Sequence, residues 1–404
     1  MSLSFYYVSN GKMYRFEDGK GGELRSEVLD SYVFKVKDSA ERNEWKYNGS
    51  GAAFTGTFQH RANASDAVSS IYSQVNCIGE YNGDIIYSID IDNTNGIYRK
   101  SSSNANDGIV LCSSSTAYRD FDIRGDLMVT TVSFAGESHV GILNLETKGF
   151  NIYTEGRSVD TSPTWSFADR EKVYFASSGL PENDDRSRQE NDAPMGISQM
   201  VNEMYSAARA SRRGPSSICV LDILQGTLDE VLANDRYDYT HPQSTSDGSL
   251  YYIRKPYKSS GGAMESLGCL ADILLLPVRL FEALFGFLNV FSAKYSGKTL
   301  SRRDVKQRDE REMFIDGNLI NAEKELRDNQ RRGEANPGII PRSWELRRLD
   351  KDGNDTLIKC GVAAFRVNEE RGDILVSNGS LILRIDKDGK EEKLLSAEGV
   401  VFIK

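Results

Sequence analysis

Histidines are the side chains best suited to proton transfer or metal binding near neutral pH. The chain has three, His60, His139 and His241. None stands at a spacing typical of metal ligands, and their surroundings do not indicate a Ser-His-Asp triad. We therefore interpret all three as structural residues.

Two further segments resemble ligand-binding loops. Gly297-Lys298-Thr299 is similar to the end of a phosphate-binding loop, but Ser292 stands where its first glycine should be. Asp350, Asp352 and Asn354 have the spacing of a calcium loop without its sharp-turn glycine and closing glutamate. Hairpin turns explain them better, as they do the acidic segment 90–93. The sequence predicts no catalytic residue, no metal site and no cofactor.

Composition narrows the class of protein. The 404 residues carry a net charge of -9, which argues against a nucleic-acid partner. Five cysteines, odd in number and far apart, suit buried reduced thiols better than a disulfide framework. The first residues enter a strand pattern without the features of a secretion signal. We expect a folded, cytoplasmic protein.

Short alternating strands with tight turns recur along the chain. The segment 7–16 aligns with 375–385, and each is a strand, an Asn-Gly turn and a second strand. Similar units begin near residues 83 and 126, about 43 residues apart, which is a period typical of propeller blades.

Two of these units resemble a known repeat. Ser162-Pro163-Thr164-Trp165-Ser166, followed by Asp169 and a strand, is similar to the Pro-x-Trp-Ser-Pro-Asp-Gly repeat of bacterial TolB-type, WD-like β-propellers. A copy without the tryptophan runs from Pro242 to Gly248. The resemblance implies the fold and says little about activity.

The predicted fold class is therefore all-β: a single β-propeller over residues 1–404. Clear repeat units cover 73–114, 117–156, 159–236, 237–362 and 363–398, and the two ends of the chain complete one further blade by pairing their strands. Residues 27–72 include the strand-like segments 32–36 and 52–55, which favours seven blades over six as a degenerate seventh.

Two helical insertions interrupt successive blades between their second and third strands. They span 181–215 and 258–341, and this shared position predicts that both lie on one face. The larger insertion has an apolar helix over 264–293 and charged helices over 301–333, where Leu319, Ala322 and Leu326 form a thin apolar edge.

The apolar helix needs a cover, because it would otherwise expose a patch larger than soluble monomers usually carry. The candidates are the helix of the first insertion together with the propeller face, a protein partner or second copy, and a membrane surface, which is the least favoured. The predicted cap or contact residues are Met200, Met204, Leu284, Phe285, Leu288 and Phe291.

The leading functional hypothesis is a non-catalytic scaffold that binds a protein partner through this helical cap. The first alternative is an enzyme or small-ligand-binding propeller with its site at the channel mouth under the cap. The second alternative is a peripheral membrane protein attached through residues 270–293.

Overall fold

The computed structural model describes residues 3–47, 68–69, 71–101, 107–134, 136–179, 213–257, 312–315 and 318–404. The chain divides into two compact units. The first comprises Met1–Glu27, Tyr72–Lys258 and Glu310–Lys404, and the second comprises Val28–Ile71 and Ser259–Asp309. Strands dominate the described residues, and every sheet formed by them belongs to the first unit.

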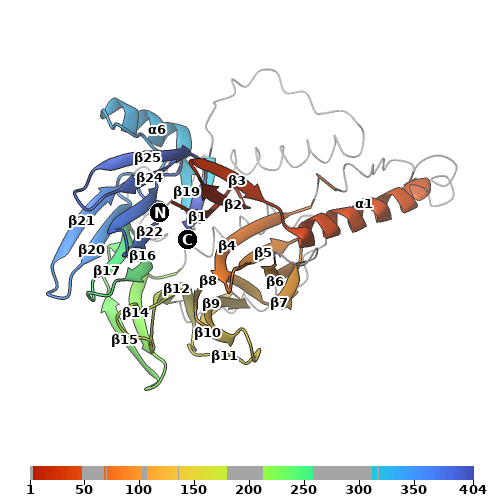
Figure 1. Cartoon of the computed structure of the whole chain (residues 1–404), viewed down its shortest axis with the longest axis horizontal. Helices are drawn as coiled ribbons and strands as arrows, with labels where there is room; N and C mark the ends of the chain where they lie inside the picture. The colour runs from red at the N-terminus through yellow and green to blue at the C-terminus, as the bar shows by residue number, and fades with distance from the viewer. Residues whose placement is uncertain are drawn as a thin grey trace, which may run out of the picture. The chain divides into compact units, whose positions relative to one another are not determined.

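One four-stranded antiparallel sheet joins the two ends of the chain. Its strand order is β26 (Val400–Ile403), β1 (Phe5–Ser9), β2 (Lys12–Glu17) and β3 (Lys20–Leu24). Tyr7 of β1 lies opposite Ile403 of β26, and Figure 1 shows the two termini near each other. The β1–β2 hairpin turns at Asn10 and Gly11, whose φ angles of 49° and 71° are those that an Asn-Gly turn adopts.

The other four-stranded groups are each built from strands that follow one another in the chain, except that β18 and β19 come between β17 and β20. Two of them, β8–β11 and β12–β15, join into one larger sheet through a single parallel pair, Ser138 and Val159. The strands are β4 (Ser73–Tyr81), β5 (Asp84–Ile91), β6 (Thr94–Lys100), β7 (Gly108–Ser113), β8 (Ala117–Arg124), β9 (Leu127–Phe134), β10 (Glu137–Asn144), β11 (Phe150–Ile152), β12 (Ser158–Trp165), β13 (Lys172–Gly179), β14 (Ser217–Asp222), β15 (Thr227–Leu232), β16 (Tyr237–Ser244), β17 (Leu250–Pro256), β20 (Glu345–Leu349), β21 (Asp355–Cys360), β22 (Ala364–Asn368), β23 (Asp373–Ser377), β24 (Leu381–Ile385) and β25 (Glu391–Ser396).

Neighbouring sheets pack against each other through their inner strands. Contacts run from β1 to β4, then to β8, β12, β16 and β22, and from β22 to β26 beside β1. Hydrophobic clusters fill the spaces between sheets: one contains Cys77 of β4, Phe121 of β8 and Leu143 of β10. Alternating side chains of each strand supply these clusters, as the period-two pattern of the sequence predicts.

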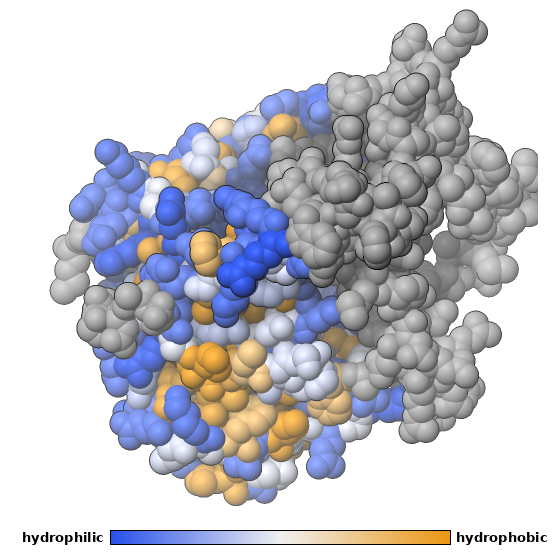
Figure 2. Space-filling model, turned by 90° about the vertical axis from the view of Figure 1, so that its right-hand side faces the viewer, coloured by the Kyte–Doolittle hydropathy of each residue, from blue (hydrophilic) through white to orange (hydrophobic). Residues whose placement is uncertain are grey.

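The outer strands are more exposed than the inner ones. Ile109 of β7, Leu228 of β15 and Leu357 of β21 are 67%, 55% and 45% exposed. On the face drawn in Figure 2, hydrophobic residues gather in one area among hydrophilic ones.

A helix replaces the strand that the sequence predicted over residues 32–36. Helix α1 spans Glu27–Tyr47, so this part of the prediction is wrong. The short alternation is outweighed by the charged run that follows, where Lys37 pairs with Glu41 and Asp38 with Arg42 one helical turn apart. The second strand expected there, 52–55, lies outside the described residues.

The described end of the larger insertion contains a β-hairpin before its helix. Strands β18 (Glu312–Ile315) and β19 (Asn318–Asn321) occupy residues for which the sequence predicted a helix, and Leu319 therefore lies in a strand. Helix α6 (Ala322–Arg331) follows, with the Asn321 side chain accepting a hydrogen bond from Lys324 N. Gly333, with φ of 76°, follows the C-cap residue Arg332, close to the predicted end of the helix.

This hairpin and helix are packed against the sheets. Ile315, Ile320 and Ala322 belong to one buried cluster with Trp344 and with Ala363, which precedes β22. The returning limb of the insertion is therefore part of the folded core of the first unit.

Candidate functional site

The first strands of all the sheets border one cavity of about 660 Å³. These strands are β4, β8, β12, β16, β22 and β26, and the cavity is of a size typical of small-ligand sites. Strands from different sheets therefore contribute to the lining of a single cavity.

The roots of both insertions reach this cavity. Ser178 precedes the first insertion and Arg213 lies near its end, while Lys255 precedes the second insertion and Ile315 lies in its returning limb. All four residues line the cavity. The bodies of the insertions, and with them the predicted cap residues Met200, Met204, Leu284, Phe285, Leu288 and Phe291, lie outside the described residues.

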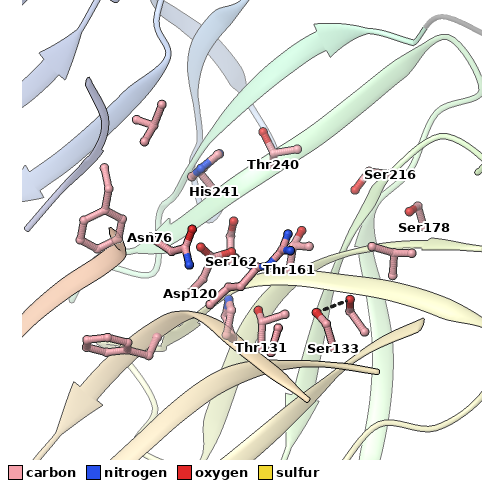
Figure 3. Close-up of a pocket in the computed structure, with 18 of the residues that line it drawn as sticks. Asn76, Asp120, Thr131, Ser133, Thr161, Ser162, Ser178, Ser216, Thr240 and His241 are labelled. Carbon is pink, nitrogen blue, oxygen red and sulfur yellow. Dashed lines mark hydrogen bonds between the residues drawn. The ribbon is translucent and has the colours of Figure 1, made fainter. Parts of the chain in front are cut away.

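Hydroxyl side chains form much of the cavity lining. Figure 3 shows Thr131, Ser133, Thr161, Ser162 and Thr240 around the cavity. Ser133 and Ser138 share a hydrogen bond of 2.7 Å. The Thr131 hydroxyl is buried without a hydrogen-bond partner among the described residues, so a bound molecule or water reaching it would satisfy a buried polar group. The other lining hydroxyls belong to Ser114, Ser115, Thr164, Ser178 and Ser216.

Apolar side chains come from other strands. Phe365 of β22, Phe402 of β26 and Ile315 of β18 line the same cavity. The cavity thus offers hydrogen-bonding groups from β9 and β12 and hydrophobic surface from β22 and β26, which is the mixture expected of a site that orients a polar ligand.

Two inner strands bulge where they border the cavity. In β12 the pairing register shifts between Thr161 and Thr164, and in β16 it shifts between Thr240 and Gln243. Ser162 and His241 have positive φ angles of 52° and 54°, and a proline follows each. Non-glycine residues with this backbone are strained, and such strain gathers at functional sites.

Hydrogen bonds between neighbouring inner strands fix these bulges. Ser162 N donates to the Asp120 carboxylate at 3.1 Å, which ties β12 to β8. Thr164 Oγ1 donates to the Pro242 carbonyl at 2.8 Å, which ties β12 to β16. Gln243 Nε2 donates to Phe365 O at 2.9 Å, which ties β16 to β22. The strained segments are therefore held in one geometry.

Opposite charges meet where β8 and β26 border the cavity. Lys404 Nζ forms an ion pair with Asp122 Oδ1, while Trp165 N donates to Asp122 Oδ2 at 3.0 Å. Burial raises the pKa of Asp122, but the charges of Lys404 and Arg366 outweigh it and hold that pKa below its usual value. Burial and the charge of Arg366 lower the pKa of Lys404, and Asp122 opposes them.

The two histidines that the structure describes have different surroundings. His241 lines the cavity, whereas His139 is buried beside Glu137, with 3.7 Å between Nε2 and the carboxylate, and His60 is outside the described residues. Asp350 Oδ1 accepts from Asp352 N at 2.9 Å and Asn354 N at 2.8 Å, which is the turn geometry that the sequence favoured. Within the described part of the chain, no group of acids, histidines and cysteines could hold a metal ion.

Sequence reasoning did not identify the cavity residues. Pro163 and Pro242 were the available indication, since a proline inside a strand lacks the N–H of the ladder and marks an edge or a bulge. Both belong to the copies of the TolB-type motif. The motif therefore coincides with the bulged segments that border the cavity.

Three comparisons relate the chain to known proteins. No family model matches the chain, and no curated protein matches it. Similar solved structures are TolB-type and other β-propeller proteins. They include TolB from Acinetobacter baumannii, with 8% identity, a TM-score of 0.45 and coverage of 98% of this chain and 64% of that one. The putative TolB from Agrobacterium tumefaciens has 13% identity, a TM-score of 0.41 and coverage of 81% and 83%.

The tricorn protease is a third similar structure, with 10% identity and a TM-score of 0.42. The match covers all of this chain and 30% of the protease. The chain thus spans less than two thirds of the Acinetobacter protein and of the tricorn protease.

None of the helices among the described residues is both long and apolar enough to cross a membrane.

Proposed function

We propose that the chain is a six-bladed propeller whose ring is closed by the β26–β1 pair, and that it binds a small polar ligand in the cavity at its centre. The blade count rests on the four-stranded meanders, counting β8–β11 and β12–β15 as two, and on the cycle of contacts between them. This function corresponds to the small-ligand alternative from the sequence.

The observation that carries the ligand-binding proposal is the pair of strained bulges at the cavity wall. A propeller that served only as a support could pair its inner strands regularly. Here Ser162 and His241 adopt left-handed backbone conformations in neighbouring strands, and both line the cavity together with many hydroxyl groups. Strain of this kind persists when surrounding contacts over-determine it, and it is most often found where a ligand is held.

A cavity-filling variant tests the proposal. The full chain is screened by thermal shift against neutral sugars, amino acids, dipeptides and di- and tricarboxylates, and each hit is confirmed by calorimetry. Thr161→Phe should abolish binding, because Thr161 lines the cavity. Thr356→Phe on the exposed outer strand β21 is the matched control and should leave binding unchanged. Binding that survives Thr161→Phe, or a screen without a confirmed hit, contradicts the proposal.

A second candidate function is the scaffold role that the sequence favoured. The observation in its favour is that the roots of both insertions border one cavity, since a partner bound there would contact both. Self-association through the insertion, membrane attachment and a cytoplasmic location stay predictions.

The scaffold role is tested by deleting residues 262–308, which leaves the packed hairpin β18–β19 and helix α6 intact. Chemical crosslinking and mass spectrometry in the native cell should identify a protein with wild type and lose it with the deletion. Reconstitution of that pair from purified proteins then confirms direct contact. Equal recovery with the deletion would exclude the insertion as the docking segment.

A further inference from the structure

One aromatic ring is exposed at the cavity. Among the large hydrophobic side chains that are exposed in the described part of the chain, Phe134 of β9 is the one that also lines the cavity, and it is 39% exposed. Phe121 and Phe365 line the same cavity but are only 4% and 3% exposed. Single hydrophobic residues are common on convex surfaces, whereas this ring borders a concave site where apolar and polar groups converge, as in ligand pockets.

The neighbours of Phe134 position its ring. The ring centroids of Phe134 and His139 are 5.4 Å apart, with an angle of 50° between their planes, and His139 is buried. Glu137 lies opposite Phe134 in the pairing of β9 with β10, so both side chains project from the same face of the sheet. Glu137 also lines the cavity, and its side chain is 32% exposed. An exposed ring and a carboxylate acceptor therefore lie next to each other at the cavity.

The polar lining of the cavity consists mostly of uncharged groups. Eleven of the lining residues are serines or threonines, and five are asparagines or glutamines. The hydroxyl oxygens of Thr131 and Thr240 are buried and have no hydrogen-bond partner among the described residues. Hydroxyl and amide groups can both donate and accept, so this lining matches a ligand whose own polar groups do both.

The charged groups of the lining nearly balance one another. Five lysines and arginines occur with four carboxylates. Asp122 forms its ion pair with Lys404, and the Asp120 carboxylate accepts from Ser162 N at 3.1 Å. Since neither sign of charge dominates, the lining is suited to a ligand without net charge.

We propose that the ligand of the cavity is an uncharged saccharide, with the C–H face of one pyranose ring stacked on Phe134 and a hydroxyl of that ring donating to Glu137. The other sugar hydroxyls exchange hydrogen bonds with the serine and threonine lining. A pyranose has C–H groups on its faces and hydroxyls around its rim, which fits an exposed aromatic ring beside acceptors and hydroxyls. This inference rests on the proposed ligand-binding function and names its ligand class.

The test titrates the purified full chain by calorimetry with glucose, galactose, mannose, N-acetylglucosamine, maltose and cellobiose. At least one sugar should bind saturably, and added sodium chloride should leave its affinity unchanged, because the ligand carries no charge to be screened. Phe134→Ala should weaken that binding by about tenfold through loss of the stacked ring. Glu137→Leu should also weaken it, because the acceptor is removed.

Two further variants separate contact with the sugar from damage to the fold. Phe134→Trp keeps an aromatic ring, so it should retain the affinity, and its indole fluorescence should change as the sugar binds. Phe167→Ala is the matched control and should bind as wild type does, because Phe167 is 51% exposed but does not line the cavity.

The inference is overturned if none of these sugars binds, if Phe134→Ala binds as wild type does, or if saturating sugar leaves the fluorescence of Phe134→Trp unchanged. Amino acids, dipeptides or carboxylates that bind and are blocked by Thr161→Phe would then leave the proposed function standing without its saccharide. A cavity that binds none of the compounds would contradict both.

Discussion

Lys404 and Asp122 form an ion pair across 282 positions of sequence, between the residue that follows β26 and strand β8. The pair skips the β4–β7 sheet that lies between them in the cycle of contacts. It therefore ties the strand that completes the terminal sheet to a strand that is not its neighbour.

The two partners of this pair should differ in their importance for stability. Asp122→Asn leaves Lys404 and Arg366 facing each other without the carboxylate, whereas Lys404→Met leaves Asp122 with Arg366 nearby. We expect Asp122→Asn to cost about 3 kcal/mol, and Lys404→Met to cost less. Urea unfolding of both variants and of the double variant measures the difference. Equal costs would show that Arg366 does not contribute.

The same pair predicts a loss of stability in acid. The folded pKa of Asp122 is below its usual value of about 3.9, so its contribution is fully present above that pH and is lost as pH falls through the lowered folded value. Between pH 5 and pH 2.5, wild type should lose more stability than Asp122→Asn does. Denaturation at a series of pH values provides the comparison, and parallel curves for the two proteins would contradict this assignment.

The sequence predicts the sheets well because their determinants are local. Alternation and Asn-Gly turns are set within a few residues, so the repeat units from 73–114 to 363–398 each coincide with a group of four antiparallel strands, two of which join into one larger sheet. Residues 32–36 show the limit of the same rule, because five alternating residues also fit the first turns of α1. The charged residues after them decide in favour of the helix.

The candidate site could be predicted only in part. Its two bulges are indicated by prolines inside strands, at Pro163 and Pro242. The partners that hold them are distant in sequence, as Thr164 and Pro242 are, and no local pattern identifies such contacts. Asp122 looks like an ordinary polar strand residue until β26 brings Lys404 against it.

Backbone strain at Ser162 can be measured by substitution. Ser162→Val places a β-branched side chain at a φ of 52° and should destabilise the protein by about 1–2 kcal/mol. Ser162→Gly should be near neutral, because glycine tolerates that angle but loses more entropy on folding. Thr161→Val, one residue earlier, is the control for loss of a hydroxyl at the cavity. If both valine variants unfold at the same urea concentration, the bulge is not strained.

The insertion should contain a dispensable part and a part that the fold requires. Deleting 262–308 should preserve the unfolding midpoint of the first unit, because the described limb from β18 to α6 stays packed on the sheets. Extending the deletion to 335 removes Ile315, Ile320 and Ala322 and uncovers Trp344, at a cost of about 3 kcal/mol or more. Asn329→Leu should weaken the same contact without a deletion, since Asn329 Nδ2 donates to Gly338 O at 2.9 Å. Thermal unfolding of the three variants decides the point: a longer deletion as stable as the shorter one would mean that the hairpin and helix only rest on the sheets without stabilising them.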